Sequence, residues 1–266
     1  MDNRPIGVFD SGVGGLTAVR RMHEIMPNES IIYFGDTGRV PYGTRSAQTI
    51  LHYTRQDVAF LRSFDIKAIV VACGTVSSVA LNTVSKEQNI PMIGVVEPAS
   101  LAAIEKTKNG RIGVIGTAST IKSGSYESFL HEHKPELKIF TKACPLFVPL
   151  VENGRVNKGD IVIETVVKEY LTELKEQNID TLILGCTHFP LLREVIADFM
   201  GENVELIDSG AAAADYAKRI LTLSDNKTSE TKYFVSDDPD SFKALSHIFL
   251  NGEIAENVGN VEIATY

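Results

Sequence analysis

The stretch Thr181-Leu-Ile-Leu-Gly-Cys-Thr-His-Phe-Pro190 joins a short apolar run to a cysteine, and a helical pattern follows it. A second stretch, Ala68-Ile-Val-Val-Ala-Cys-Gly-Thr-Val-Ser77, has the same arrangement. Short apolar runs that end at a turn are typical of buried parallel strands. Cys73 and Cys186 are therefore predicted at the carboxyl ends of two strands, which is the edge where open α/β sheets bind ligands.

Strand and helix patterns alternate through the first part of the chain. Strands are predicted at residues 6–9, 31–34, 68–72 and 91–96, and a helix at 47–64. Residues 35–43 are rich in Gly and Pro, which indicates a loop. Strands that alternate with helices of this length indicate βαβ units and a parallel sheet.

The pattern restarts at Arg111-Ile-Gly-Val-Ile-Gly116, which is similar to the first strand. Further strands are predicted at residues 138–141, 181–184 and 204–207, with a loop at 145–154 and a helix at 160–175. A repeat of this length indicates a duplicated domain.

We predict an α/β protein with two similar parallel-sheet lobes, related by a pseudo-two-fold axis, and an active-site cleft between them. Residues 1–96 are expected to form the first lobe and residues 97–209 the second. Residues 210–266 are expected to return to the first lobe, with strands at 233–235 and 261–263.

The composition narrows the class of function. The 266 residues suffice for two domains, and the net charge of −8 argues against a nucleic-acid partner. The three cysteines, Cys73, Cys144 and Cys186, form no C-x-x-C pair, which favours a reducing compartment and argues against structural zinc. Because no signal-peptide pattern or apolar run of ~18 residues is present, we expect a soluble cytoplasmic protein without a membrane partner.

Two thiols that face each other across a cleft fit one reaction especially well. Inversion of a carbon stereocentre by proton transfer requires a base on one face of the carbon and an acid on the other. A cysteine can serve in both roles, because its pKa of ~8.5 falls toward neutrality near a helix N-terminus or a cation. Cys144 lies outside the repeat and is interpreted as structural.

The glycines after the first strand also permit a cofactor interpretation, which we reject. Gly12-Val-Gly-Gly15 has only part of the dinucleotide motif, since Thr17 occupies its third glycine position. Asp10 would also repel a pyrophosphate. We therefore expect no cofactor and no metal.

Several motifs together resemble the bacterial glutamate racemases of the cofactor-independent Asp/Glu racemase superfamily. They are Asp10-Ser-Gly-Val-Gly-Gly15, Gly35-Asp-Thr37, Arg39-Val-Pro-Tyr-Gly43, the Cys73 strand, Gly116-Thr117 and Gly185-Cys-Thr-His188. The resemblance covers nearly the whole chain in order. It implies interconversion of L- and D-glutamate, which supplies D-glutamate for peptidoglycan, and it implies a homodimer.

The resemblance also implies roles for individual residues. Cys73 and Cys186 would each take the α-proton from one enantiomer, with assistance from Asp10, Glu152 and His188. Substrate-binding residues, which include Asp10 and His188, would also comprise Ser11, Pro41, Tyr42, Gly43, Gly74, Thr75, Thr117, Thr120 and Thr187. The chain departs from the family at Gly74, where Asn is usual, and this departure puts one substrate contact in doubt.

Other functions remain open from the residues alone. The same superfamily includes racemases for other substrates, for example aspartate. A non-catalytic protein that closes two lobes on a small anion would have a similar pattern. Thiol redox chemistry is a further alternative, which predicts a Cys73–Cys186 disulfide under mild oxidation.

Overall fold

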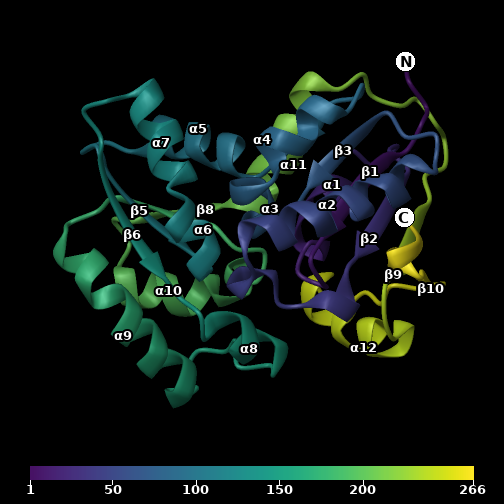
Figure 1. Ribbon diagram of the computed structural model, residues 1–266. Coiled ribbons are helices and arrows are strands. Elements are labelled where there is room, and N and C mark those ends of the chain that lie inside the picture. The colour runs from purple at the N-terminus through teal and green to yellow at the C-terminus, as the bar shows by residue number, and fades with distance from the viewer.

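The computed structural model describes residues 1–266 and contains two parallel sheets, which lie side by side with helices packed around them (Figure 1). The first sheet has the order β10-β9-β2-β1-β3-β4 and contains β1 (Ile6–Asp10), β2 (Ile31–Gly35), β3 (Ala68–Val71), β4 (Met92–Ile93), β9 (Thr231–Val235) and β10 (Gly259–Asn260). The second has the order β6-β5-β7-β8 and contains β5 (Arg111–Gly116), β6 (Lys138–Ala143), β7 (Thr181–Leu184) and β8 (Glu205–Asp208). Every strand pair is parallel.

Helices connect the strands in both halves of the chain. The α-helices are α1 (Leu16–Ile25), α2 (Ala47–Arg62), α3 (Gly74–Val79), α4 (Leu81–Val84), α5 (Val96–Lys106), α6 (Ala118–Ser123), α7 (Ser125–His133), α8 (Phe147–Glu152), α9 (Ile161–Glu176), α10 (Arg193–Met200), α11 (Ser209–Ile220) and α12 (Pro239–Phe249). Short 3₁₀ turns occur at η1 (Thr37–Arg39), η2 (Tyr42–Thr44), η3 (Ser85–Glu87), η4 (Phe189–Leu192) and η5 (Ile263–Thr265).

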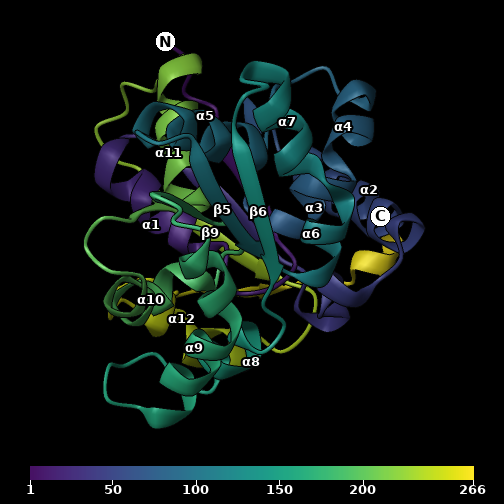
Figure 2. The ribbon, with the colours of Figure 1, turned by 90° about the vertical axis from the view of Figure 1, so that its left-hand side faces the viewer.

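The two sheets repeat one strand order. Strands β2-β1-β3-β4 in the first sheet correspond to β6-β5-β7-β8 in the second, and β5 and β6 are seen side by side in Figure 2. All four residues of β3 and all four of β7 are buried, as expected for apolar strands covered on both faces. The predicted α/β fold with two similar parallel-sheet lobes is therefore confirmed.

Local sequence signals explain where the long helices begin. The side chain of Ser46 accepts a hydrogen bond from the backbone N–H of Thr49, so it caps α2. Asp160 caps α9 in the same way, by accepting from the N–H of Val162. The helices predicted at residues 47–64 and 160–175 are confirmed to within two residues at each end.

Four predicted elements differ from the structure. The strand at residues 91–96 is reduced to β4, because Val96 already begins α5. The predicted loop at 145–154 contains α8. The predicted strand at 261–263 is replaced by the two-residue β10 and the turn η5. The helix after Cys73 breaks into α3 and α4 at Ala80, whose φ of −114° departs from helical geometry.

The segment after β8 crosses back to the first sheet. Helix α11 packs against both α1 and α5, and β9 then pairs with β2. The division of the chain into lobes at residues 96 and 209 stays a prediction. None of the helices has the length and apolar character needed to cross a membrane.

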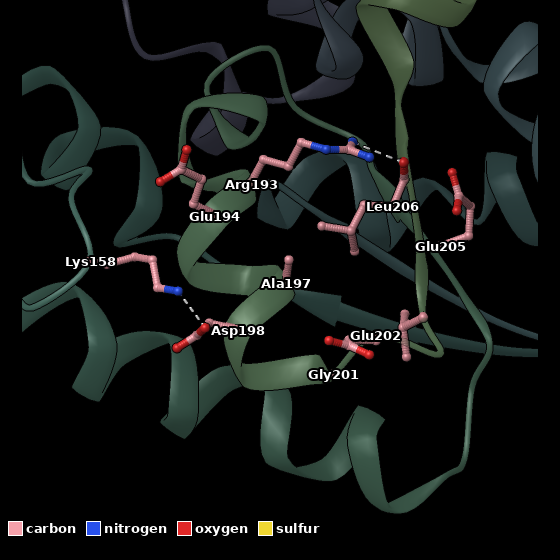
Figure 3. A pocket seen from close by; sticks show the side chains of 10 residues that line it. Lys158, Arg193, Glu194, Ala197, Asp198, Gly201, Glu202, Glu205 and Leu206 are labelled. Atoms are coloured by element: carbon pink, nitrogen blue, oxygen red, sulfur yellow. Dashed lines mark hydrogen bonds and ion pairs between the residues drawn. The ribbon is translucent and has the colours of Figure 1, made fainter.

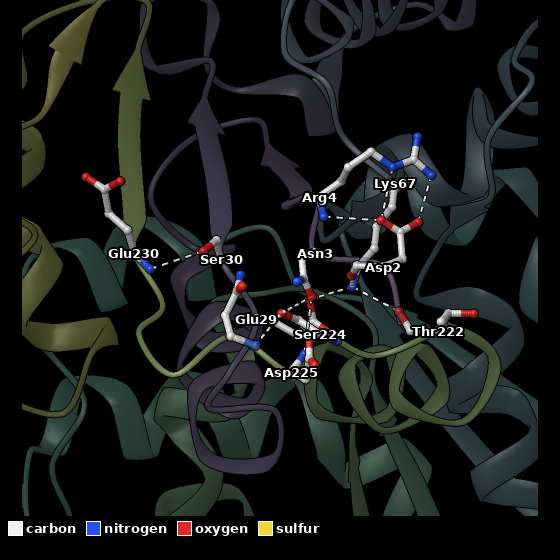
Figure 4. A network of polar contacts seen from close by, with 11 residues as sticks. Asp2, Asn3, Arg4, Glu29, Ser30, Lys67, Thr222, Ser224, Asp225 and Glu230 are labelled. Atoms are coloured by element: carbon white, nitrogen blue, oxygen red, sulfur yellow. Dashed lines mark hydrogen bonds and ion pairs between the residues drawn. The ribbon is translucent and has the colours of Figure 1, made fainter.

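A buried ion pair anchors this returning segment (Figure 4). Nζ of Lys67 lies 2.6 Å from a carboxylate oxygen of Glu29, with both side chains at most 3% exposed. The same ammonium group donates to the backbone oxygens of Asp2 and Thr222, at 2.8 and 3.0 Å. Glu29 also accepts from the backbone N–H of Ser224. These contacts hold the N-terminal residues and the 222–224 segment against the base of β3.

Candidate active site

The first thiol follows β3 and directly precedes α3. Cys73 is buried, and its Sγ lies 3.5 Å from Oγ of Ser11, to which it donates. Burial and, to a smaller extent, the negative charge of Asp10 raise the pKa of the Cys73 thiol to about 12, against the effect of the Ser11 hydrogen bond. Cys73 is therefore a protonated thiol at neutral pH.

Asp10 ends β1 and lies beside this thiol. One of its carboxylate oxygens accepts from the N–H of Gly12 at 3.1 Å, whereas its Oδ1 is buried without a hydrogen-bond partner. Burial raises the pKa of Asp10, and the nearby charge of His188 opposes this shift. An unpartnered buried carboxylate oxygen is costly, so it is suited to receive a donor from a ligand.

The second thiol follows β7 through Gly185 and lies next to a histidine. Nε2 of His188 lies 2.9 Å from Oε1 of Glu152, at the end of α8, and Nδ1 lies 3.4 Å from Oγ1 of Thr187. Burial lowers the pKa of His188, but the adjacent Cys186 and Glu152 more than offset this and raise it to about 10. A positively charged imidazole therefore lies beside Cys186.

The two thiols thus have different surroundings, although they follow equivalent strands. A carboxylate neighbours Cys73, and an imidazolium neighbours Cys186. The helix predicted directly after Cys186 is also different, because η4 intervenes before α10 and Pro190 lies in this 3₁₀ turn. The positive charge near Cys186 therefore comes from a side chain rather than from the end of an α-helix.

Backbone contacts bring the two strand ends together. A methyl group added at Gly74 would overlap the carbonyl oxygen of Gly185 and would lie 3.7 Å from Cα of Cys186. One added at Gly14 would lie 2.7 Å from Nδ1 of His188. The segments that carry Cys73 and Cys186 are therefore in direct contact, which requires the absence of a side chain at Gly74.

Hydroxyl residues extend this contact between the sheets. Oγ1 of Thr75 lies 2.9 Å from Oγ1 of Thr117, and Thr117 lies 3.0 Å from Oγ1 of Thr120. A methyl group added at Gly43 would lie 2.9 Å from Cβ of Thr117. Hydroxyl groups on α3 and α6 thus meet at the junction of the two sheets, together with the turn at Gly43.

Tyr42 belongs to a buried network of polar side chains. Its ring is buried, and its hydroxyl donates to the carboxylates of Asp36 and Asp57. Arg39 pairs with the same carboxylates at 2.6 and 2.8 Å. Burial raises the pKa of Asp57 well above its ordinary value, and so does the negative charge of Asp36. This network fixes the turn that presents Gly43, while Pro41 beside it is exposed.

Sequence reasoning missed this network and one further contact. Arg39 and Asp36 were visible as loop residues, but Asp57 lies in the middle of a helical pattern, where nothing distinguishes it from a solvated residue. Oγ of Ser119 donates to the backbone oxygen of Gly43 at 2.8 Å and so joins α6 to the same turn. Cys144, interpreted as structural, is fully buried.

A separate surface cavity of about 580 Å³ lies beside α10, away from the thiols (Figure 3). Nζ of Lys158 pairs with Asp198 at 2.5 Å across it, and Arg193 donates to the backbone oxygen of Leu206. Its remaining charged residues are acidic. No group of three or more His, Cys, Asp or Glu side chains in the chain is arranged to hold a metal ion.

Comparison with known proteins decides the family. The sequence model of the Asp/Glu/Hydantoin racemase family matches residues 6–217. A glutamate racemase from Persephonella marina is 47% identical over 249 residues, which cover 94% of each chain. The chain belongs to the glutamate racemases. One from Geobacter metallireducens is 44% identical over 258 residues, which cover 95% of each chain.

Solved glutamate racemases share the fold. The crystal structure from Francisella tularensis in complex with D-glutamate superposes with a TM-score of 0.92, at 38% identity and 100% coverage of both chains. An isoform from Bacillus anthracis also gives a TM-score of 0.92, at 39% identity and 98% coverage of both chains. The resemblance to the glutamate racemases is therefore confirmed over the whole chain.

Proposed function

We propose that the chain interconverts L- and D-glutamate by proton transfer between its α-carbon and two thiols, Cys73 and Cys186. The observation that carries the proposal is their placement. Each thiol follows the third strand of one of two equivalent sheets, and the segments around Gly74 and Gly185 touch. Thiols on equivalent strands of opposed sheets can approach a carbon from opposite faces.

The reaction requires one thiolate and one thiol at the start. The thiolate removes the α-proton and leaves a carbanion, and the opposite thiol then donates its own proton to the other face. In one direction Cys186, which lies beside the cationic His188, removes the proton, and Cys73, whose pKa is about 12, donates its own. The reverse direction starts from the exchanged protonation state, and each turnover conserves both protons.

Neighbouring residues supply the binding contacts in this proposal. Oδ1 of Asp10, buried without a partner, would accept from the substrate ammonium. Hydroxyl groups of Ser11, Thr75, Thr117, Thr120 and Thr187, with backbone N–H groups at Gly43 and Gly74, would bind the two carboxylates. Glu152 would act through His188, because its carboxylate contacts the imidazole.

Glutamate is favoured over aspartate as the substrate. Two relatives that cover 94–95% of the chain at 44–47% identity are named glutamate racemases, and a structure that superposes over its full length holds D-glutamate. In the cell, the enzyme would act in the cytoplasm as a homodimer and supply D-glutamate for peptidoglycan. Sedimentation velocity tests the dimer.

Racemisation in deuterated water tests the function. Each glutamate enantiomer is incubated separately with the protein, and chiral chromatography and mass spectrometry follow the products. We expect both enantiomers to be converted, with one deuterium at the α-carbon of the product. Absence of α-exchange with either enantiomer would refute the proposal. A faster rate with aspartate in a parallel assay would transfer the proposal to the alternative substrate.

A further inference from the structure

Arg39, in the loop between β2 and α2, is held by more acceptors than a structural ion pair needs. Its Nε and Nη2 pair with Asp36 and Asp57, whose side chains are fully buried, while the Arg39 side chain is 17% exposed. Nη1 donates to Oε1 of Gln56 at 2.5 Å. Cζ lies over the ring of Tyr53, 4.1 Å from the ring centroid. Each nitrogen of this guanidinium group therefore has its own acceptor.

The same network ties the loop to a third segment. Oγ of Ser236, directly after β9, donates to Oδ1 of Asp36 at 2.7 Å and accepts from the N–H of Gly38 at 2.9 Å. At the other end of the loop, the hydroxyl of Tyr42 donates to the carboxylates of Asp36 and Asp57. The loop is thus fixed at both of its ends, by side chains from α2 and from the tail.

Beyond Tyr42, the loop meets the second sheet through Gly43. Oγ of Ser119 donates to the backbone oxygen of Gly43 at 2.8 Å. The three atoms nearest to a methyl group at Gly43 all belong to Thr117, at 2.9 to 3.3 Å. Oγ1 of Thr117 in turn lies 2.9 Å from Oγ1 of Thr75. The turn therefore reaches the junction of the sheets through α6 rather than through either thiol segment.

Buried charges are an expensive way to stabilise a fold. Replacement of a buried ion pair by apolar side chains often leaves the free energy of unfolding unchanged or raises it. A guanidinium group supplies something that apolar side chains lack, because its fixed fork of donors specifies the direction of each hydrogen bond. The contribution of Arg39 and Asp57 is therefore expected in the placement of the loop.

We propose that Arg39 and Asp57 are positioning residues for substrate binding, which hold the Gly43 turn where its backbone meets a substrate carboxylate. This inference rests on the racemase function proposed above. Neither side chain touches the substrate, and both act through the loop. The carboxylate at this turn is remote from the reacting carbon, so its contacts are the same in the ground state and the transition state. Loss of such contacts raises KM and leaves kcat unchanged.

Steady-state kinetics with each glutamate enantiomer test the inference. Arg39→Lys keeps the positive charge but loses the fork, and we expect KM to rise at least ~10-fold, which corresponds to ~1.4 kcal/mol. We expect kcat to stay within about 3-fold of the unmodified chain. Asp57→Ala should have the same effect, whereas Asp57→Asn, which keeps an oxygen at this position, should restore KM.

This split between KM and kcat separates placement of the loop from stability of the fold. A variant that is only less stable has fewer active molecules, so its apparent kcat falls while its KM stays the same. Arg55→Lys is the matched control on α2, because Arg55 pairs with Glu87 through Nε and Nη2, at 3.0 and 2.6 Å, on the surface. Its KM should not change.

Three outcomes would overturn the inference: an unchanged KM in Arg39→Lys, a fall of kcat alone in that variant, or an equal rise of KM in Arg55→Lys. Circular dichroism checks the fold of each variant, and Arg39→Lys decides the matter if Asp57→Ala does not fold. Failure of the racemase function is seen separately, as no turnover by the unmodified chain.

Discussion

Gly74 and Gly185, which lie next to the two thiols in sequence, are in backbone contact across the junction of the sheets. A methyl group at Gly74 would lie 3.2 Å from the carbonyl carbon of Gly185 and would overlap its oxygen. The obstructing atoms belong to the backbone, so no side-chain rotation can relieve the overlap. The distance between the two thiol segments therefore depends on the absence of a side chain at this position.

We expect Gly74→Ala to separate the two sheets at this contact. The radius of gyration measured by small-angle X-ray scattering should rise, and amide hydrogen exchange in α3 and α6 should become faster. Racemisation should slow, because a displacement of about 1 Å between reacting groups can cost ~10²-fold in rate. Gly74→Asn, which introduces a larger side chain at the same position, should produce the same separation.

Gly210→Ala is the matched control for this substitution. A methyl group at Gly210 would meet its nearest neighbours at an ordinary 3.4 Å, so it should leave both the scattering and the rate unchanged. Unaltered scattering and exchange in Gly74→Ala would contradict the idea that this glycine sets the approach of the lobes.

Glu152→Gln tests the charge on His188. The pKa of His188 is about 10 in the folded chain and ~6.5 when unfolded, so its charge stabilises the fold fully below pH ~6.5. This contribution is lost as the pH rises through the folded pKa. Removal of the Glu152 carboxylate lowers that pKa. The Tm difference between the unmodified chain and the variant should therefore shrink from pH 6.5 to 10.

Because the Glu152 side chain is 40% exposed, we expect this Tm difference to be small. Nitrogen NMR of labelled histidine reports the His188 titration directly and should show the lower pKa. Glu176→Gln makes the same change of charge at an exposed position on α9 and should leave the His188 titration unchanged. An unaltered His188 titration in Glu152→Gln would refute the coupling.

Cys73→Ser and Cys186→Ser should each reduce racemisation in both directions by ~10²–10⁴-fold, the usual contribution of a general acid or base. Circular dichroism should show an unchanged fold. Cys144→Ala is the control, because Cys144 is a buried thiol without a role in the proposed proton transfer, and it should retain turnover. Near-full activity of either serine variant would exclude a two-thiol mechanism.

Lys67→Met should destabilise the chain by ~3–5 kcal/mol, because it leaves the Glu29 carboxylate buried without its cation. The double variant Lys67→Met/Glu29→Leu should recover much of this loss. Urea unfolding measures both. Arg55→Gln breaks an exposed pair with Glu87 and should leave the urea midpoint nearly unchanged. If the double variant is no more stable than Lys67→Met, the buried charge is not the cause of the destabilisation.

The sequence predicted those parts of the fold that depend on local patterns. The apolar runs before Cys73 and Cys186 identified two central strands, and the duplication identified two sheets. The prediction of a strand at residues 91–96 was wrong because apolar residues such as Val95 and Val96 fit a buried strand and a buried helix equally well. In the folded chain, tertiary packing places them at the start of α5.

The site was predictable to a similar extent. The thiols, Asp10 and the Thr-rich turns stand next to strands in the sequence, whereas their partners come from distant positions. Asp57 contacts Tyr42 from inside α2, and Glu152 reaches His188 from a helix within a predicted loop. No local pattern specifies such pairs, because they arise only when separate elements pack together.

The strand order has a consequence for synthesis on the ribosome. Strand β9, which pairs with β2 in the first sheet, is encoded after every strand of the second sheet. The nascent chain therefore carries an unpaired β2 edge while about two hundred further residues are translated. Newly made chains should depend on chaperones during this interval, more than a protein whose domains are continuous in sequence.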